Sequence, residues 1–196
     1  MIYASNQQYA LFRNLQYDPT PIDAANPAGL VNDLFSFQLQ GNDTVYTSYG
    51  IDTPNEKYAA VLEYNGTGII AGATSEYSLL AWGCDGDGVP YYASYSTETE
   101  VTGTPAGIDI MSTNEEGPDE TTVEALVKAL KDLPDVEIQG LAANLTRMTQ
   151  DGGRDGLPRV SPRAAEELIR SLTICCLQAT CDDYCKTNQN LIGILG

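Results

Sequence analysis

The chain has 196 residues, which is enough for one domain with a substantial core and an appended segment. Its 27 acidic and 10 basic side chains give a net charge of -17, which argues against binding to the phosphate backbone of nucleic acids. The absence of histidine excludes Ser-His-Asp and Cys-His catalysis, and no apolar run approaches the ~20 residues of a membrane-spanning helix.

The cysteines and glycosylation sequons indicate an oxidising compartment. Four of the five cysteines crowd together near the end of the chain, at Cys175, Cys176, Cys181 and Cys185, and the fifth is Cys84. A zinc site made of four cysteines needs two well-separated pairs, so disulfide bonds are favoured over a metal site. Sequons begin at Asn42, Asn65 and Asn144. We therefore expect a secreted, extracellular glycoprotein or one in an oxidising organelle lumen.

Alternating side chains predict a series of short strands. Phe35, Phe37 and Leu39 share one face of the first clear strand, while Ser36 and Gln38 share the other, which predicts an apolar interior and a solvent-exposed exterior. Similar runs recur at roughly ten-residue intervals, the pattern of an antiparallel sandwich or barrel. They cover 45–49, 58–64, 69–73, 76–82, 91–96 and 107–112.

The connections carry their own signals. Pro19, Pro21 and Pro27 predict a loop over residues 18–29. Asn65-Gly66 is typical of a two-residue hairpin turn. Asp85-Gly86-Asp87-Gly88 favours a glycine-rich turn over a calcium loop, because the further oxygen ligands and the closing glutamate are absent.

One amphipathic helix is predicted at residues 120–133. Thr121-Thr-Val-Glu124 matches a capping box at its start, and Pro134 ends it. Its apolar stripe requires an apolar landing site, so some outward residues of the underlying strands should be apolar too. The stripe consists of Val123, Leu126, Val127, Leu130 and Leu133.

Several of these segments resemble the lipocalin family of the calycins. Residues 73–84, ending in Cys84, resemble its second signature, residues 108–112 stand where its last long strand would be, and the helix resembles the lipocalin helix. Two features depart from the family pattern. The only tryptophan is Trp82, so the Gly-x-Trp of the first strand is absent, and Thr113 holds the place of the signature arginine.

The resemblance implies a mainly β fold, an antiparallel up-and-down barrel with an outer amphipathic helix. We assign residues 1–148 to this barrel and residues 149–196 to a linker and a Cys-rich helical tail that the resemblance does not cover. Because the signature arginine and its tryptophan are missing, other residues must close the barrel. Related barrels often bridge the cysteine at the position of Cys84, which implies a disulfide to the tail. The alternative keeps both disulfides within residues 175–185 and leaves Cys84 a buried thiol.

The resemblance also implies a cup for a small hydrophobic ligand: a lipid, retinoid, bilin or carotenoid pigment, with no required cofactor. Strand tyrosines suit such a cup, since each ring offers apolar contact and a hydroxyl. They equally suit a filled barrel. We expect an elongated cavity that opens near residues 18–29. Alternation picks as ligand-binding candidates Phe35, Phe37, Tyr49, Tyr58, Leu62, Tyr64, Tyr91 and Tyr95.

Two other classes of function remain open. The protein could be a non-enzymatic assembly subunit, with the barrel as scaffold and the tail docking on a protein partner or a second copy. It could also be an enzyme that acts on a lipid or pigment through aspartate or glutamate as acid and base. No paired acid stands at a diagnostic spacing, so we expect no enzymatic activity and no metal site.

Overall fold

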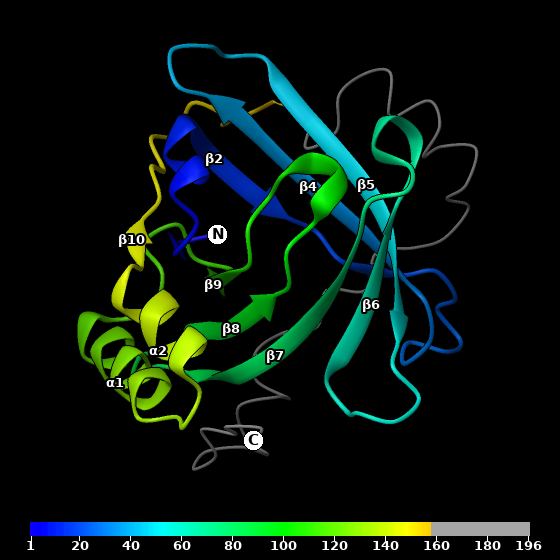
Figure 1. The fold of residues 1–196 in the computed structure, drawn as a ribbon. Coiled ribbons are helices and arrows are strands. Elements are labelled where there is room, and N and C mark those ends of the chain that lie inside the picture. Colours follow the sequence, from blue (N-terminus) through cyan, green and yellow to red (C-terminus); the bar gives the residue numbers. More distant parts are fainter. Residues whose placement is uncertain (158–196) are drawn as a thin grey trace.

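The computed structural model describes residues 1–157, which form a curved antiparallel sheet with two helices packed on its outside (Figure 1). The sheet has ten strands in the order β10-β1-β9-β8-β7-β6-β5-β4-β2, with β3 paired to β4. The predicted mainly β, up-and-down architecture is confirmed. The elements are β1 (Tyr3–Ala4), η1 (Gln7–Leu11), β2 (Phe12–Tyr17), β3 (Thr20–Pro21), β4 (Val31–Leu39), β5 (Val45–Pro54), β6 (Val61–Gly66), η2 (Gly68–Ile70), β7 (Thr74–Cys84), β8 (Pro90–Ser96), η3 (Glu100–Thr102), β9 (Gly107–Ser112), α1 (Glu120–Lys131), α2 (Val136–Ala143) and β10 (Thr146–Arg147).

The helices cover the outer face of β7, β8 and β9. Val123, Leu126 and Leu130 of α1 are buried against outward side chains of these strands, including Ile108 and Ile110. The predicted apolar landing site is thereby confirmed. Between Met1 and Leu157, no helix combines the length and the apolar character needed to cross a membrane.

The cap of α1 differs from the predicted capping box. Asp119 is the N-cap residue, and its Oδ1 accepts a hydrogen bond of 2.8 Å from the Thr122 backbone N–H. These backbone hydrogen bonds at the helix start lower the pKa of the Asp119 carboxyl. The helix therefore begins before Thr121, which lies inside its first turn.

The two hairpin signals have different outcomes. Asp85 Oδ1 accepts hydrogen bonds from the backbone of Asp87 (3.0 Å) and Val89 (2.8 Å), which confirms the glycine-rich turn. The prediction of a two-residue turn at Asn65-Gly66 is wrong. Asn65 still pairs with Thr74, and the chain reverses direction only after it, through η2. A Cβ on Gly66 would lie 2.5 Å from the Ile70 carbonyl oxygen, so glycine serves a close backbone approach here.

The outer face of β4 is not exposed as its polar residues predict. Ser36 and Gln38 are both fully buried. Arg154 Nη1 donates to Ser36 Oγ at 3.0 Å, and Gln38 Nε2 donates to the Gly153 carbonyl at 3.2 Å. The predicted solvent-exposed exterior is wrong at these positions because residues 149–154 cover it and supply the polar partners.

Residues 149–154, which we call the closing segment, join the two ends of the sheet. The Asn14 backbone N–H of β2 donates to the Thr149 carbonyl at 2.8 Å, directly after β10. The Arg13 guanidinium forms an ion pair of 2.8 Å with Asp151 and a second one with Asp43. Arg154 Nη1 also donates to the Asn14 carbonyl at 3.1 Å. Arg13 and Arg154 thus close the barrel, and part of the predicted linker belongs to the barrel wall.

The three sequon asparagines, Asn42, Asn65 and Asn144, are exposed, and their glycosylation stays a prediction. The second predicted helix, the apolar end of the chain and the four clustered cysteines all fall within residues 158–196, outside the described part of the chain.

Cys84 lies half-buried at the end of β7, and we expect non-reducing peptide mapping to find it joined to a tail peptide. Such a bridge would close a loop of about 90–100 residues and stabilise the protein by up to ~4–5 kcal/mol in the chain-entropy model. Alkylation of Cys84 in unfolded protein without reductant would contradict the bridge and favour disulfides confined to the tail.

Candidate functional site

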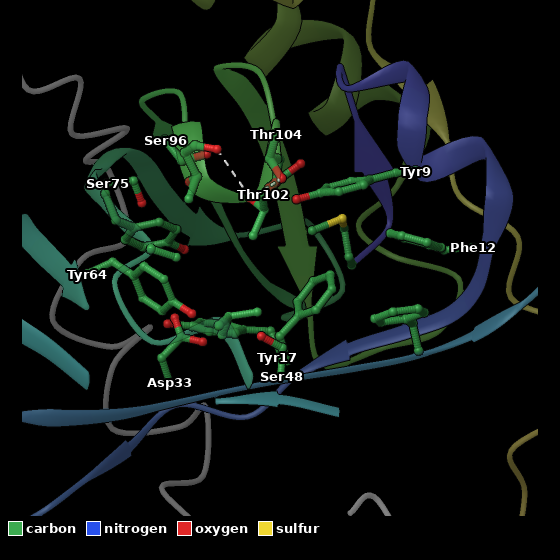
Figure 2. Close-up of a pocket in the computed structure, with 18 of the residues that line it drawn as sticks. Tyr9, Phe12, Tyr17, Asp33, Ser48, Tyr64, Ser75, Ser96, Thr102 and Thr104 are labelled. Atoms are coloured by element: carbon green, nitrogen blue, oxygen red, sulfur yellow. Dashed lines mark hydrogen bonds between the residues drawn. The ribbon is translucent and has the colours of Figure 1, made fainter. Parts of the chain in front are cut away.

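A cavity of about 500 Å³ lies inside the barrel. Its walls come from β2 and β4 to β9, together with residues of η1, η2 and η3 (Figure 2). The volume falls within the roughly 300–1,000 Å³ of pockets that hold drug-sized ligands. The barrel is therefore a cup rather than a filled core.

The cavity opens at the end of the barrel that carries η1, η2 and η3, which are short 3-10 helices. Its most exposed lining residues are Gln8, Tyr46, Ile69 and Thr102, which come from η1, η2, η3 and the start of β5. Successive connections of an antiparallel sheet alternate between its two ends, and the loop at 18–29 lies at the other one (Figure 1). The predicted opening near residues 18–29 is wrong. Part of that loop instead lines a smaller hollow of about 210 Å³.

Stacked aromatic rings form one wall of the cavity. Phe12 on β2 stacks on Phe37 on β4, with ring centroids 4.1 Å apart, and Phe37 in turn stacks on Tyr46 at 5.8 Å. Tyr9 of η1 lies 5.5 Å from Phe12. These rings offer an apolar ligand a large and rigid contact surface.

The opposite part of the cavity is polar. Tyr17, Asp33, Ser48 and Tyr64 gather there (Figure 2). The Tyr17 hydroxyl donates a hydrogen bond of 3.1 Å to Oδ2 of Asp52, whose side chain is almost completely buried.

Burial changes the acidity of the groups in this polar region. Burial and the nearby Asp52 carboxylate raise the pKa of Asp33 to about 7. Burial raises the pKa of Asp52 to about 6, while the hydrogen bond from Tyr17 opposes the rise. Burial also raises the pKa of Asp109, on β9, to about 7 and that of Tyr64 to about 12. Near neutral pH the cavity therefore holds protonated and ionised carboxyls side by side.

Two residues of the cavity lining each have a buried carboxyl oxygen that lacks a hydrogen-bond partner within residues 1–157. Oδ1 of Asp52 and Oδ1 of Asp109 are buried and accept no hydrogen bond from any residue in 1–157. An unsatisfied buried acceptor costs about 1–3 kcal/mol. The described lining contains three aspartates and neither lysine nor arginine, and burial lowers the pKa of its one basic group, the Met1 amino group, to about 6. The chemistry of the cavity thus favours a neutral or donor-bearing ligand over an anionic one.

The sequence is similar to that of Botcinic acid biosynthesis cluster B protein 12 of Botryotinia fuckeliana (strain B05.10), with 30% identity over 160 residues. The matched region covers 79% of this chain and 72% of the relative. The chain belongs to the family of this cluster protein. No protein-family model matches the sequence.

Solved structures with the same architecture are lobster apocrustacyanin A1 and apocrustacyanins C1 and C2. Each has a TM-score of 0.52 and 12% identity, over 76% of this chain and 74% of the other. At this identity the similarity concerns the fold alone. It confirms that this member of the cluster-protein family has a lipocalin fold, as the sequence signatures predict.

Three of the predicted ligand-binding residues of this family member, Phe35, Phe37 and Tyr64, line the cavity. The other predicted residues do not line it. Tyr58 and Leu62 line the smaller hollow. Tyr49 pairs with Leu34, whereas its neighbour Ser48 lines the cavity.

The last two candidates, Tyr91 and Tyr95, belong to the cluster that packs under the helices. Neighbouring residues of a strand face opposite sides, so choosing the wrong face by one residue misplaces the whole strand. On β8 the more apolar face lies under α1 and α2, and the cavity face carries serines, Ser94 and Ser96.

Apart from Tyr64, sequence reasoning missed the polar residues in the interior of the cavity. Asp33 carries a usable signal, because it stands two residues before Phe35 and therefore on the same face of the strand. Asp52 and Tyr17 carry no such signal, since their strands lack a clear apolar face. The set that was missed comprises Tyr17, Asp33, Asp52, Tyr77 and Asp109.

Proposed function

We propose that the protein binds a small, hydrophobic and uncharged metabolite that carries a hydroxyl or carbonyl group. The observation that supports this most is the cavity itself, with stacked rings on one side and hydrogen-bonding groups on the other. Apolar walls with a few polar groups that fix orientation are the usual composition of small-molecule sites. Lipids, retinoids, bilins and carotenoid pigments remain candidate classes.

The charge of the cavity lining reduces the number of candidate ligand classes. A carboxylate ligand would meet Asp33, Asp52 and Asp109. The one basic group among the described lining residues is the Met1 amino group, and burial lowers its pKa to about 6, so it is mostly uncharged at pH 8. Like charges in a buried site repel strongly. We therefore favour alcohols, ketones and other neutral compounds over fatty acids.

The family relation supports a metabolite ligand. The relative is named after a biosynthesis cluster, so we propose that the ligand here is an intermediate or product of a biosynthetic pathway. Secretion and a protein partner for the tail stay predictions.

The test compares two probes with one skeleton. Retinol and retinoic acid differ in the group at one end, a neutral hydroxyl against a carboxylate. We expect retinol to displace a fluorescent apolar probe at pH 8 and retinoic acid to do so at least tenfold more weakly, since about 1.4 kcal/mol of repulsion suffices for that factor.

Matched variants locate the site. Ser75 on β7 lines the cavity, while its neighbour Thr74 is exposed and faces the other side of the strand. We expect Ser75→Trp to fill the cavity and abolish probe binding and Thr74→Trp to leave binding unchanged. Equal binding by both variants, or no binding of any neutral probe by the unaltered protein, would contradict the proposed function.

A further inference from the structure

Two carboxyl groups occupy adjacent positions on the cavity wall. In the β4–β5 pairing, Asp33 lies opposite Gly50 and Val31 lies opposite Asp52. Asp33 and Asp52 are therefore diagonal neighbours on one face of the sheet, and both line the cavity.

Two tyrosine side chains pack closely against this pair of carboxyl groups. A Cβ at Gly50 would lie 2.1 Å from Cε2 of Tyr64, so only glycine lets that ring cross β5 toward the carboxyls. Tyr17 reaches the pair from β2 and bonds one oxygen of Asp52 at 3.1 Å. The other oxygen, Oδ1, stays buried without a partner in residues 1–157. Asp52 lines the cavity, so a ligand there lies next to its carboxyl group.

We propose that Asp52 and Asp33 act as a base and an acid that shift a proton within a bound apolar ketone. This inference rests on the proposed function, because the ketone must first occupy the cavity. It goes beyond the non-enzymatic role expected from the sequence. The substrate class is a neutral carbonyl compound with a hydrogen on the carbon next to the carbonyl.

The reaction needs no other reactant. The Asp52 carboxylate takes the proton from the carbon, and the electron pair of the broken C–H bond forms the C=C bond of an enol. The carbonyl oxygen takes the proton of the Asp33 carboxyl. The proton on Asp52 exchanges with water, and Asp52 then delivers a proton to the same carbon, which gives isotope exchange. Delivery to a more distant conjugated carbon instead moves the double bond. The enol proton returns to Asp33, so atoms and electrons balance.

The protonation states of Asp33 and Asp52 agree with this assignment of base and acid. The raised pKa values of about 6 for Asp52 and about 7 for Asp33 leave one carboxylate and one carboxyl over a narrow range near neutrality. Tyrosines supply the other titratable groups that face the pair, and burial raises the pKa of each, so they stay neutral there. They are Tyr9, Tyr17, Tyr64 and Tyr92. We expect a bell-shaped pH profile with its maximum between about pH 6 and 7.

The experiment uses β-ionone, a neutral apolar ketone, in D₂O. Mass spectrometry measures deuterium uptake at the carbon next to its carbonyl, and displacement of the fluorescent probe measures binding separately. We expect the full chain to accelerate uptake over buffer. Asp52→Asn should slow the accelerated rate about 100-fold or more while β-ionone still binds. Asp87→Asn, at an exposed turn residue, is the matched control and should change nothing.

Tyr17→Phe tests positioning. Because the Tyr17 hydroxyl lowers the pKa values of both Asp52 and Asp33, its loss should move both limbs of the pH profile toward higher pH. Binding of β-ionone without accelerated exchange, or exchange that persists in Asp52→Asn, would overturn the acid–base pair and leave the proposed binding function intact. Failure of β-ionone and all other neutral probes to bind would overturn both.

Discussion

We expect the free energy of unfolding to fall as the pH rises from 5 to 8. Asp33, Asp52 and Asp109 have folded-state pKa values raised to about 6–7, against about 3.9 in an unfolded chain. Between these values the three carboxyls hold more protons in the folded protein than in the unfolded one. The Met1 amino group opposes part of the fall, because burial lowers its pKa from 8.0 to about 6. The stability that the carboxyls contribute is complete below about pH 4 and is lost as the pH rises through about 7.

One buried carboxyl with a pKa near 7 accounts for roughly 2–3 kcal/mol of this fall. Urea unfolding at pH 5 and pH 8 measures it, and pH 5 keeps the protein above its isoelectric point of about 4.1. Asp109→Asn should reduce the difference between the two pH values. Asp87→Asn, which removes an exposed charge, should retain it. Equal pH dependence in Asp109→Asn and the unaltered protein would contradict the protonation assigned to Asp109.

Leu126→Ala should lower the free energy of unfolding by about 2–5 kcal/mol. Leu126 is 1% exposed and lies between α1 and the sheet, so the smaller side chain leaves a cavity there. Leu11→Ala is the control, since Leu11 is 65% exposed and the same substitution should cost less than about 0.5 kcal/mol. Denaturant unfolding of both variants measures these two losses of stability. A loss for Leu126→Ala as small as that for Leu11→Ala would place the helix stripe in solvent.

The sequence predicts the elements of this fold well where one face of an element is apolar. The stripe on α1 and the alternation around Phe35 and Phe37 both reflect burial against a continuous apolar surface, and both elements lie where they were expected. Short strands such as β1 and β10 carry no such pattern. Pairing partners far away in the sequence determine them: Tyr3 pairs with Ile110 on one side and with Arg147 on the other.

The candidate site could be predicted only in part, because a barrel of this kind has two buried faces. On the inner face of the barrel, Phe37 and Asp33 both line the cavity. Outside, Tyr91 packs under the helices. Alternation shows that neighbouring residues face opposite sides but not which side holds the cavity, so aromatic residues were assigned to both. The acidic pair depends on the register of β4 against β5, which the spacing of the residues does not reveal.

The closing segment has a consequence for how the protein folds during synthesis. Its contacts join residues separated by 137 positions, as in the hydrogen bond from Asn14 to Asp151, and by 140 positions, as in that from Arg154 to Asn14. Contacts between such distant residues make folding slow. While a ribosome is still making residues 149–154, the emerged sheet has an unsealed seam, with the amide of Gln38 and the hydroxyl of Ser36 open to water. The nascent barrel can therefore close only after all ten strands of the described sheet have been made, and until then its edges are open to pairing with other chains.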